Sequence, residues 1–304
     1  MQLSEDNSLL ATHKTKQIDL AMRLKRFNEL TKPRQTALLL FTGIGTYIAS
    51  IGFSAITWKH LALLVAMTYL TVSGTTILNM VFDRDIDKEM GRTKKRPIPQ
   101  GIVRVKEATT VGLALIVLGI AGAAYWINTI TAVVLFAGVF LDLPVYTIWL
   151  KRRHRYSIIF GGIAGGMPAL AGRTAVIGRI DLIGILLVIF ISTWVPIHIL
   201  TLAIVYQDDY GKVGVPMWPV QVGNDATLRF IAFSSVIAAL TILYAAMLFK
   251  VYLPVLVLFG ISSTWLIYLC LKNLYDPTIS RNWTIFKFAS IYMSMAFFFL
   301  PFHP

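Results

Sequence analysis

Residues 60–97 read HLALLVAMTYLTVSGTTILNMVFDRDIDKEMGRTKKRP. Positions 60–81 contain no aspartate, glutamate, lysine or arginine, whereas positions 79–97 hold four acids and six bases. About 20 apolar residues is the length that a helix needs to cross the ~30 Å hydrocarbon layer of a bilayer. The stretch therefore predicts a membrane-spanning helix that ends in a dense cluster of charge.

The whole chain of 304 residues has the composition of a membrane protein. Charged residues make up 14% and hydrophobic residues 56%, whereas soluble domains carry about 25% charged residues. The pattern predicts an all-α polytopic membrane protein with nine transmembrane helices around a central cavity. A polar, basic tail at 1–34 would precede this nine-helix domain, 35–304. The apolar runs are 35–54, 60–81, 108–127, 129–149, 158–177, 182–206, 228–248, 251–271 and 284–302.

The net charge of +13 would also suit a nucleic-acid-binding protein, but its distribution indicates membrane topology instead. Of the 28 lysines and arginines, 24 fall in the N-terminal tail and in every second connection between apolar runs. Basic residues collect on the cytoplasmic side of membrane proteins. We therefore expect a cytoplasmic N-terminus, and nucleic acid is not needed to explain the charge.

Two smaller features limit the alternatives. The polar tail includes Leu20–Leu30, which is either an amphipathic surface helix or a loose topogenic segment. Cys270, the single cysteine, lies inside an apolar run. One cysteine provides neither a disulfide framework nor a thiolate metal site.

Three oxygen-bearing side chains recur at four-residue spacing at the end of the run 60–81. Asn79, Asp83 and Asp87 would lie along one stripe of a helix. Two carboxylates and an amide oxygen suit Mg²⁺, which commonly binds through one or two carboxylates together with substrate phosphates. The alternative is a topogenic loop in which the acids pair locally with Arg84 or Lys88.

The residues around this stripe favour a site for a metal-bound diphosphate. Cations beside chelating acids are suited to phosphate oxygens. A second acidic pair, Asp208 and Asp209, ends the run 182–206 on the same predicted side of the membrane, followed by Lys212. Acids contribute little to membrane topology, so topology does not explain this second pair. Two acidic clusters on one face could instead hold two metal ions. The bases that follow the first cluster are Arg92, Lys94, Lys95 and Arg96.

Ionisable residues also occur within the apolar runs. Asp142 and Tyr146 lie one turn apart, and His198 lies ten residues before Asp208. An intramembrane ionisable residue is a functional candidate, although each of these could instead serve as a structural hydrogen-bonding group. The segment GGIAGGMPALAG (161–172) permits close helix packing, makes room for a bulky ligand, or both.

Taken together, these motifs resemble the UbiA superfamily of intramembrane prenyltransferases, and within it the protoheme IX farnesyltransferase (haem O synthase) family. The superfamily pattern N-x-x-x-D-x-x-x-D stands at Asn79, Asp83 and Asp87. The haem-directed version is DRDID (83–87) with RTKKRP (92–97). Further blocks, in the order of the family, are YTIWLKRR (146–153), GGIAGGMP (161–168), PIH (196–198) and DYGKVGVPMWPV (209–220).

The chain departs from the family pattern at three positions. His154 and Ser157 stand where threonine and asparagine are usual, and Arg173 stands where tryptophan is common. These departures concern details of substrate contact and leave the reaction class unchanged. The D-D-Y form of the second acidic motif is the one that haem O synthases share.

The resemblance implies that farnesyl diphosphate donates a farnesyl group to a vinyl group of haem b, with addition of water, giving haem O. It implies Mg²⁺ held by Asn79, Asp83, Asp87, Asp208 and Asp209. It places the site towards the cytoplasmic face of a prokaryotic plasma membrane. The expected diphosphate ligands are Arg92, Lys94, Lys95, Arg96, Lys151, Arg152 and Lys212, and the candidates near the acceptor are His198, Tyr146 and Asp142.

Two alternatives remain at this point. Within the enzyme class, the acceptor could be a quinone precursor or a glycerol phosphate. An ion-coupled transporter would also use intramembrane acids, but it predicts repeated halves, and the chain shows no convincing internal repeat.

Overall fold

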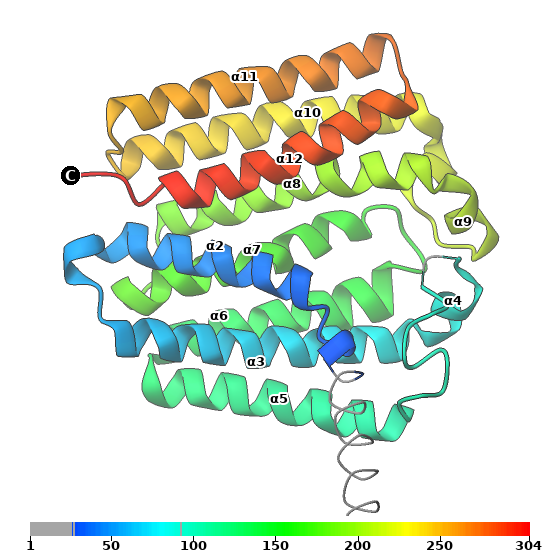
Figure 1. The fold of residues 1–304 in the computed structure, drawn as a ribbon, viewed down its shortest axis with the longest axis horizontal. Helices are drawn as coiled ribbons and strands as arrows, with labels where there is room; N and C mark the ends of the chain where they lie inside the picture. Colours follow the sequence, from blue (N-terminus) through cyan, green and yellow to red (C-terminus); the bar gives the residue numbers. More distant parts are fainter. Residues whose placement is uncertain (1–25, 27, 92) are drawn as a thin grey trace, which may run out of the picture.

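The computed structural model describes residues 26, 28–91 and 93–304, and this part of the chain is helical without strands (Figure 1). Counting α6 with its continuation η2, the described residues form nine helices of 19 to 31 residues. The short helices are η1 (Phe53–Ala55), α4 (Arg84–Glu89) and α9 (Gln207–Lys212). The long ones are α2 (Pro33–Ile51), α3 (Trp58–Phe82), α5 (Val105–Trp126), α6 (Thr129–Phe140) with the π-helix η2 (Leu141–Leu150), α7 (Ser157–Ile177), α8 (Leu182–Val205), α10 (Trp218–Leu248), α11 (Leu253–Tyr275) and α12 (Ile279–Phe299).

Every apolar run of the sequence lies in one of the long helices. The largest difference is at the run 228–248, because its helix α10 already begins at Trp218. Six helices are long and apolar enough to cross a membrane, namely α3, α5, α6 with η2, α8, α10 and α11. The prediction of an all-α membrane protein is confirmed, whereas the number of nine spans and the cytoplasmic N-terminus stay predictions. Most of Leu20–Leu30 lies outside the described residues.

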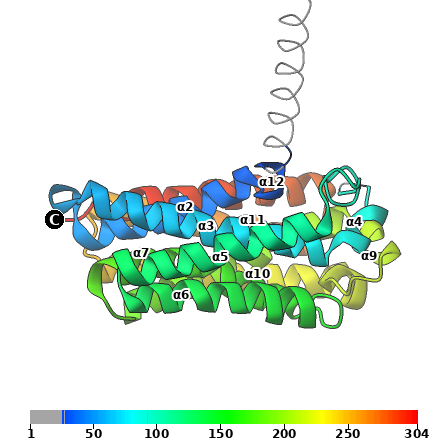
Figure 2. The same cartoon turned by 90° about the horizontal axis from the view of Figure 1, so that it is seen from below.

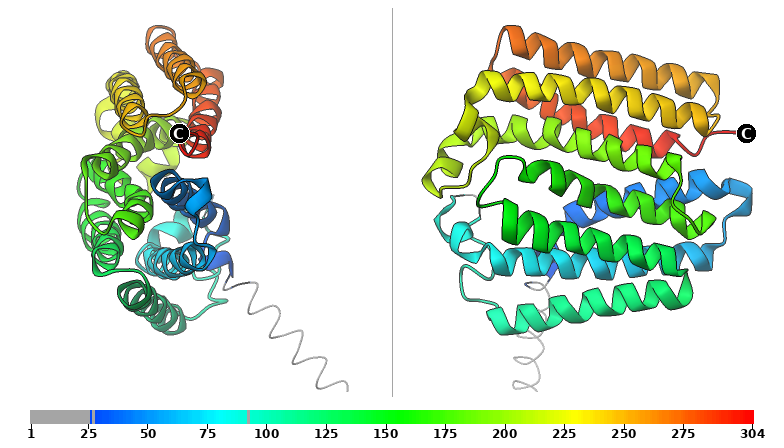
Figure 3. Two further views of the ribbon diagram at one scale, coloured as in Figure 1. Left: turned by 90° about the vertical axis from the view of Figure 1, so that its left-hand side faces the viewer. Right: turned by 180° about the vertical axis from the view of Figure 1, so that it is seen from behind.

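Most of the long helices lie side by side in two layers (Figures 2 and 3), and α11 and α5 lie at the two edges of the bundle (Figure 1). One layer contains α6, α7, α8 and α10, and the other contains α2, α3 and α12. Contacts of α2 with α7, of α12 with α8 and of α3 with η2 join the two layers. The connections that carry α4 and α9 lie at one end of the bundle, opposite the C-terminus (Figure 1).

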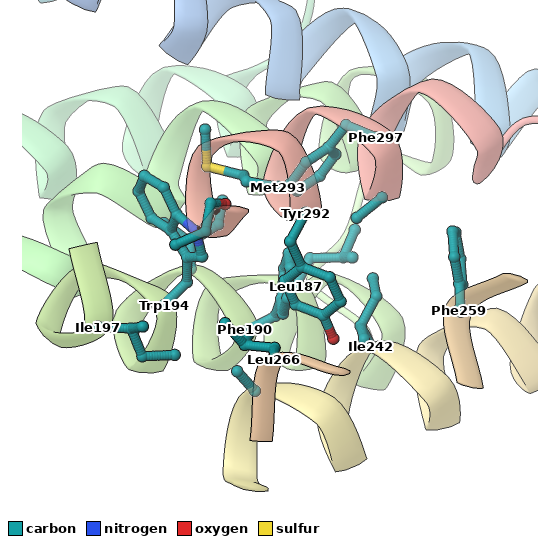
Figure 4. Packing of buried hydrophobic residues seen from close by; sticks show 14 of the residues in the cluster. Leu187, Phe190, Trp194, Ile197, Ile242, Phe259, Leu266, Tyr292, Met293 and Phe297 are labelled. Carbon is teal, nitrogen blue, oxygen red and sulfur yellow. Dashed lines mark hydrogen bonds between the residues drawn. The ribbon is translucent and has the colours of Figure 1, made fainter. Parts of the chain in front are cut away.

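The largest buried cluster surrounds α8 (Figure 4). The polar atoms of two of its buried aromatic residues, Trp194 and Tyr292, form hydrogen bonds, as burial requires. The Trp194 Nε1–H donates to the carbonyl of Ala289 at 2.7 Å, and the Tyr292 hydroxyl lies 2.7 Å from Ser263 Oγ. Residues of α8, α10, α11 and α12 that meet in this cluster include Leu187, Phe190, Ile197, Ile242, Phe259, Leu266, Met293 and Phe297.

Two glycines of α7 allow this helix to approach α8 closely. A Cβ at Gly162 would lie 2.9 Å from the backbone of Ser192, and one at Gly166 would lie 2.9 Å from the Cα of Val188. Real Cβ atoms do not come so near to a backbone. The small residues of 161–172 therefore serve close helix packing, which was one of the two expected roles.

Candidate active site

The two acidic segments lie next to each other at the end of the bundle. Ile86 and Met90, in and just after α4, share a buried cluster with Val215, which follows α9. The carboxylate oxygen Oδ2 of Asp209 lies 4.0 Å from the position that a Cβ on Gly91 would occupy. The predicted meeting of the first and second acidic clusters on one face is therefore seen in the fold.

The helix carrying the first acidic cluster bends at Asp83. The backbone there has φ −87° and ψ 1°, so α3 ends at Phe82 and α4 begins at Arg84. The four-residue hydrogen bonds nevertheless continue, from Asp83 N to Asn79 O at 2.9 Å and from Asp87 N to Asp83 O at 2.8 Å. The one-turn spacing of Asn79, Asp83 and Asp87 thus survives the bend.

Asp83 and Asp87 are almost completely buried, at 2% and 3% exposure. Lys151 Nζ, at the C-terminal end of η2, donates to Asp83 Oδ2. Arg96 Nη1 donates to both carboxylate oxygens of Asp87, at 2.8 and 2.7 Å. Charges buried to this degree are stable only when they are paired. Lys151 and Arg96, which come from other segments of the chain, provide the partners that Asp83 and Asp87 need.

Asp85 lies on the exposed side of α4 and belongs to a separate ion pair. Arg152 contacts both of its oxygens, at 2.7 and 2.6 Å, and also donates to the carbonyl of Phe82 at the end of α3. This contact holds the pKa of Asp85 far below its usual range. The alternative of local pairing does not describe these acids, because Arg84 donates to the carbonyl of Val81 instead.

A π-helix orients the amide of Asn79. Pro144 lies within η2 and has no N–H to donate, which favours a wide turn. The hydroxyl of Thr147 donates to the carbonyl of Asp142 at 2.6 Å and accepts a hydrogen bond from Asn79 Nδ2 at 2.7 Å. Because Nδ2 is engaged, the carbonyl oxygen of Asn79 remains as the atom available to a cation.

Lys32 is a residue of this site that sequence reasoning missed. It is half-buried and adopts the left-handed conformation, φ 45° and ψ 65°, immediately before Pro33, where that conformation is disfavoured. Burial, with the nearby charges of Arg96 and Lys151, lowers its pKa to about 8, while Asp142 and Asp83 act in the opposite direction. Its sequence signal was a basic residue three positions before the first apolar run, 35–54.

The three candidates for acceptor contacts fall in two places. Tyr146 lies beside Lys151, whose Nζ is 5.8 Å from the ring centroid, and Asp142 faces Lys32, Lys151 and Asn79. Tyr146 and Asp142 therefore both lie near the ion pair of Asp83 with Lys151. His198 is separate from the acids.

The ring of His198 lies between two aromatic rings of the bundle. It stacks on Trp194 of α8 at 4.8 Å and on Phe286 of α12 at 4.1 Å, and its Nδ1 is 3.3 Å from Ser290 Oγ. Such stacking fixes the plane of the imidazole. The structure therefore places His198 at the interface of α8 and α12 and in no hydrogen bond, among the described residues, with the acidic clusters.

The remaining predicted residues line the outer part of this end. Lys94, Lys95, Asp208 and Lys212 are exposed. Their side chains can therefore change partner at little cost, since exposed ion pairs contribute little to stability. Arg92 lies outside the described residues.

The donor atoms at this end fit a divalent cation. No group of three or more His, Cys, Asp and Glu side chains already converges within the parts of the chain that the structure describes. Asp83 Oδ1, however, is buried and has no hydrogen-bond partner there. An unpartnered carboxylate oxygen beside the Asn79 amide is the kind of hard ligand that Mg²⁺ prefers.

Comparison with known proteins identifies the family. A sequence profile of the UbiA prenyltransferase family matches residues 38–292. The chain belongs to the UbiA prenyltransferase family. It is 46% identical over 208 residues to a protoheme IX farnesyltransferase of Korarchaeum cryptofilum, covering 68% of this chain and 69% of that protein. It is 36% identical to the protoheme IX farnesyltransferase of Archaeoglobus fulgidus, covering 91% and 96%.

Solved structures of the family share the fold. A digeranylgeranylglyceryl phosphate synthase superposes with a TM-score of 0.78 at 21% identity, covering 92% of this chain and 98% of that one. A UbiA homologue from Archaeoglobus fulgidus, bound to GPP and Mg²⁺, superposes with a TM-score of 0.64 at 16% identity, covering 90% and 99%. Because the chain belongs to a prenyltransferase family, we no longer consider the alternative of an ion-coupled transporter.

One departure from the family pattern has a structural explanation. Arg173, near the end of α7, donates to Asp181 Oδ2 at 2.7 Å and to Ser50 Oγ at 3.1 Å. Burial acts to raise the pKa of Asp181, but hydrogen bonds from Arg173 and the Gly184 N–H outweigh it and lower the pKa. Arg173 thus ties α7, α8 and α2 together at the end opposite the acids.

Proposed function

We propose that this protein transfers the farnesyl group of farnesyl diphosphate to a vinyl group of haem b, with addition of water, giving haem O. The observation that carries the proposal is the buried cluster of Asp83–Lys151 and Asp87–Arg96 at one end of the bundle. Its acids and bases suit a metal-bound diphosphate, and relatives that match most of the chain carry the name of this reaction.

The bases of the cluster would bind the diphosphate, which is the leaving group. When the allylic C–O bond breaks, the electron pair stays on the diphosphate, whose negative charge rises. Lys151, Arg96 and Lys32 lie together and supply cations that stabilise this charge. Arg152, which pairs with Asp85, and the exposed Lys94, Lys95 and Lys212 are the candidates to neutralise the outer phosphate oxygens.

The acids of the cluster provide the ligands for Mg²⁺. Asn79, Asp83 and Asp87 would hold one ion, with Asp208 and Asp209 for a second. When bound, Mg²⁺ would supply further electrostatic stabilisation of the leaving group. Lys151 and Arg96 pair with the two buried carboxylates, so acids and bases of the proposed site lie in direct contact.

An apolar groove between α2 and α12 is suited to the isoprenoid tail. It has a volume of about 490 Å³. Phe41 of α2 forms one wall, and α12 supplies the other with Ile291, Met295, Phe298 and Phe299, together with two serines. Ile291 and Phe298 are exposed, so the tail would lie where the bundle meets the hydrocarbon of the bilayer.

Capture of the cation then completes the reaction. A vinyl carbon of haem b bonds to C1 of the farnesyl group, and the positive charge moves to the vinyl carbon next to the porphyrin ring. Water adds to that carbon, and its surplus proton passes to solvent. Tyr146 and Asp142, beside Lys151, are our candidates for contact with the acceptor or the water, with His198 deeper in the bundle.

We further propose that the site faces the cytoplasm from a prokaryotic plasma membrane. The connections at the acidic end carry most of the lysines and arginines. Such a bias orients a membrane protein with this end inside.

The purified protein, incubated with Mg²⁺, farnesyl diphosphate and haem b, tests the proposed reaction. The expected product is a haem whose mass has increased by one farnesyl group and one hydroxyl group, because the added water gives up a proton. An unchanged haem, together with prenylated 4-hydroxybenzoate when that acceptor is supplied, would assign the enzyme to quinone-directed prenyl transfer instead.

A further inference from the structure

Arg155 and Trp218 form a polar contact at the acidic end that the proposed donor site does not use. Arg155 lies in the connection between η2 and α7, and Trp218 begins α10. The guanidinium carbon of Arg155 is 5.5 Å from the Trp218 ring centroid and 4.9 Å from that of Tyr156. Trp218 in turn stacks on Phe230, with ring centroids 4.3 Å apart and planes inclined by 2°.

Both polar residues of this contact have unsatisfied donors. Arg155 Nε and Trp218 Nε1 are buried, and neither has a hydrogen-bond acceptor among the described residues. The only hydrogen bond that the Arg155 side chain makes there is from Nη2 to the Tyr156 hydroxyl, at 3.2 Å. Leaving a buried donor without an acceptor is costly, and two such donors beside one cation indicate a missing anionic acceptor.

The position of this contact separates it from the diphosphate ligands. Lys151 and Arg152, earlier in the same connection, pair with Asp83 and Asp85. Arg155 instead turns towards the start of α10. The contact thus lies beside the proposed donor site and uses none of the residues proposed as metal or diphosphate ligands.

We propose that Arg155 and Trp218 bind a carboxylate of the acceptor substrate. This inference rests on the proposed function, because haem b carries two propionates, which are the charged groups of its periphery. A carboxylate accepts the paired N–H groups of a guanidinium in a bidentate arrangement.

Such an anchor would also orient the acceptor. The propionates and the vinyl groups lie on opposite edges of the haem. Holding the propionate edge beside Arg155, at the charged end of the bundle, turns the vinyl edge away from the membrane surface and towards the apolar interior. Arg155 and Trp218 are therefore positioning residues for the acceptor, and they do not contact the diphosphate.

A comparison of two acceptors tests the assignment. Steady-state kinetics with haem b and with its dimethyl ester, which has no carboxylate, are measured for wild type, Arg155→Gln and Trp218→Phe. We expect Arg155→Gln to raise the KM for haem b roughly tenfold or more, and to leave the KM for the ester and for farnesyl diphosphate within about twofold. Trp218→Phe keeps an aromatic ring at this position but removes the indole N–H, and should raise the KM for haem b by a smaller factor.

Two matched variants show whether the effect is specific. Arg153→Gln removes a neighbouring exposed arginine, which hydrogen-bonds only the carbonyl of Trp149 among the described residues, and should leave the KM for haem b unchanged. Arg155→Lys keeps the charge and should restore part of the affinity. Thermal unfolding of each variant checks that it is folded, and titration of haem absorbance measures acceptor binding without turnover.

Other outcomes overturn the inference. An equal loss with haem b and with the ester would mean that Arg155 supports the fold. An effect of Arg155→Gln that appears in nanodiscs with anionic phospholipid, disappears in phosphatidylcholine and is the same for both acceptors would assign the site to a lipid phosphate. A wild-type protein that neither binds nor farnesylates haem would refute the proposed function itself, whereas an active wild type matched by Arg155→Gln would refute this inference alone.

Discussion

Asp83 combines two properties at the residue level that rarely occur together. Its carboxylate is buried and paired through Oδ2 with Lys151, yet its Oδ1 has no partner among the described residues. A purely structural ion pair would satisfy both oxygens, because an unsatisfied buried oxygen is costly. The arrangement instead leaves one ligand atom free for a cation.

We therefore predict that Asp83→Asn lowers turnover by at least ~100-fold, since removing a metal ligand and its charge weakens stabilisation of the leaving diphosphate. The amide oxygen can still accept a hydrogen bond from Lys151, so the fold should persist. Product haem is quantified by mass, and folding by thermal unfolding. Glu89→Gln, an exposed change near the end of α4, is the control and should keep nearly full activity. Full activity of Asp83→Asn would refute the metal assignment.

Lys32 makes stability depend on pH. Its folded pKa of about 8 lies below the ordinary value of 10.5 because of burial and the nearby Arg96 and Lys151. Between these two pH values the unfolded chain binds more protons than the folded one, so the stability due to this group rises with pH. Below pH 8 the buried charge lowers the stability of the fold.

Lys32→Met should accordingly be more stable than wild type at pH 7. It should also lack the part of the rise in unfolding temperature between about pH 8 and 10 that Lys32 contributes. Thermal unfolding in detergent at several pH values measures both effects. Parallel pH profiles for the two proteins would show that Lys32 is not the group responsible.

At the level of elements, η2 links the acceptor candidates to the metal ligands. Its wide turns place Thr147 between the carbonyl of Asp142 and the amide of Asn79. Lys151 directly follows the last residue of η2, and its backbone N–H donates to the carbonyl of Tyr146. A regular α-helix would rotate these side chains relative to one another.

Thr147→Val should therefore reduce both stability and turnover. The change leaves Asn79 Nδ2 without its acceptor, at an expected loss of about 1–3 kcal/mol, and frees the amide to rotate. Equilibrium unfolding and initial rates of haem prenylation are the measurements. Thr193→Val removes a hydroxyl that bonds only within its own helix, α8, and should change neither by much. Equal effects of the two variants would exclude a positioning role for Thr147.

The approach of α7 to α8 gives a second prediction for an element. Gly166→Ala would place a Cβ 2.9 Å from the Cα of Val188, so the helices must separate, at a cost of about 1–3 kcal/mol. Gly260→Ala in α11 meets nothing within 4 Å and should be neutral or slightly stabilising. Unfolding temperatures of the two variants provide the comparison. Similar temperatures would mean that the interface tolerates a wider spacing.

At the scale of the whole molecule, the two ends of the bundle differ in charge. The α4 and α9 end carries the acids and most of the bases, and the η1 end carries Lys59, Arg173, Arg179 and Lys250 as its lysines and arginines. A bilayer separates these ends, since the helices between them present exposed apolar side chains, such as Val117 of α5 and Ile261 of α11.

Cysteine labelling in intact cells tests the orientation. Phe53→Cys, in η1, should react with a membrane-impermeant maleimide, because Phe53 is 55% exposed and that end is expected outside. Lys95→Cys should react only after the cells are broken. Wild type should give little background because Cys270 is 1% exposed. The reverse pattern would place the acidic end outside.

The sequence by itself determined the features that depend on neighbouring residues. The apolar runs predicted the positions of the long helices, because the length of a span is set by the thickness of the bilayer. The four-residue spacing of Asn79, Asp83 and Asp87 predicted a shared stripe, and the motif blocks indicated the family. Even the side on which the second acidic pair lies followed from counting helices.

The tertiary structure alone decided which side chains meet. Asn79 with Thr147, and Asp83 with Lys151, are each 68 residues apart. These pairs depend on how α3 packs beside η2, and on the π-helical turns that aim Thr147 and Lys151. Local spacing carries no information about such contacts, since the register between two helices is set by side-chain packing along their whole length. For the same reason the sequence did not reveal the role of Lys32 in this site, or the stacking of His198 between Trp194 and Phe286.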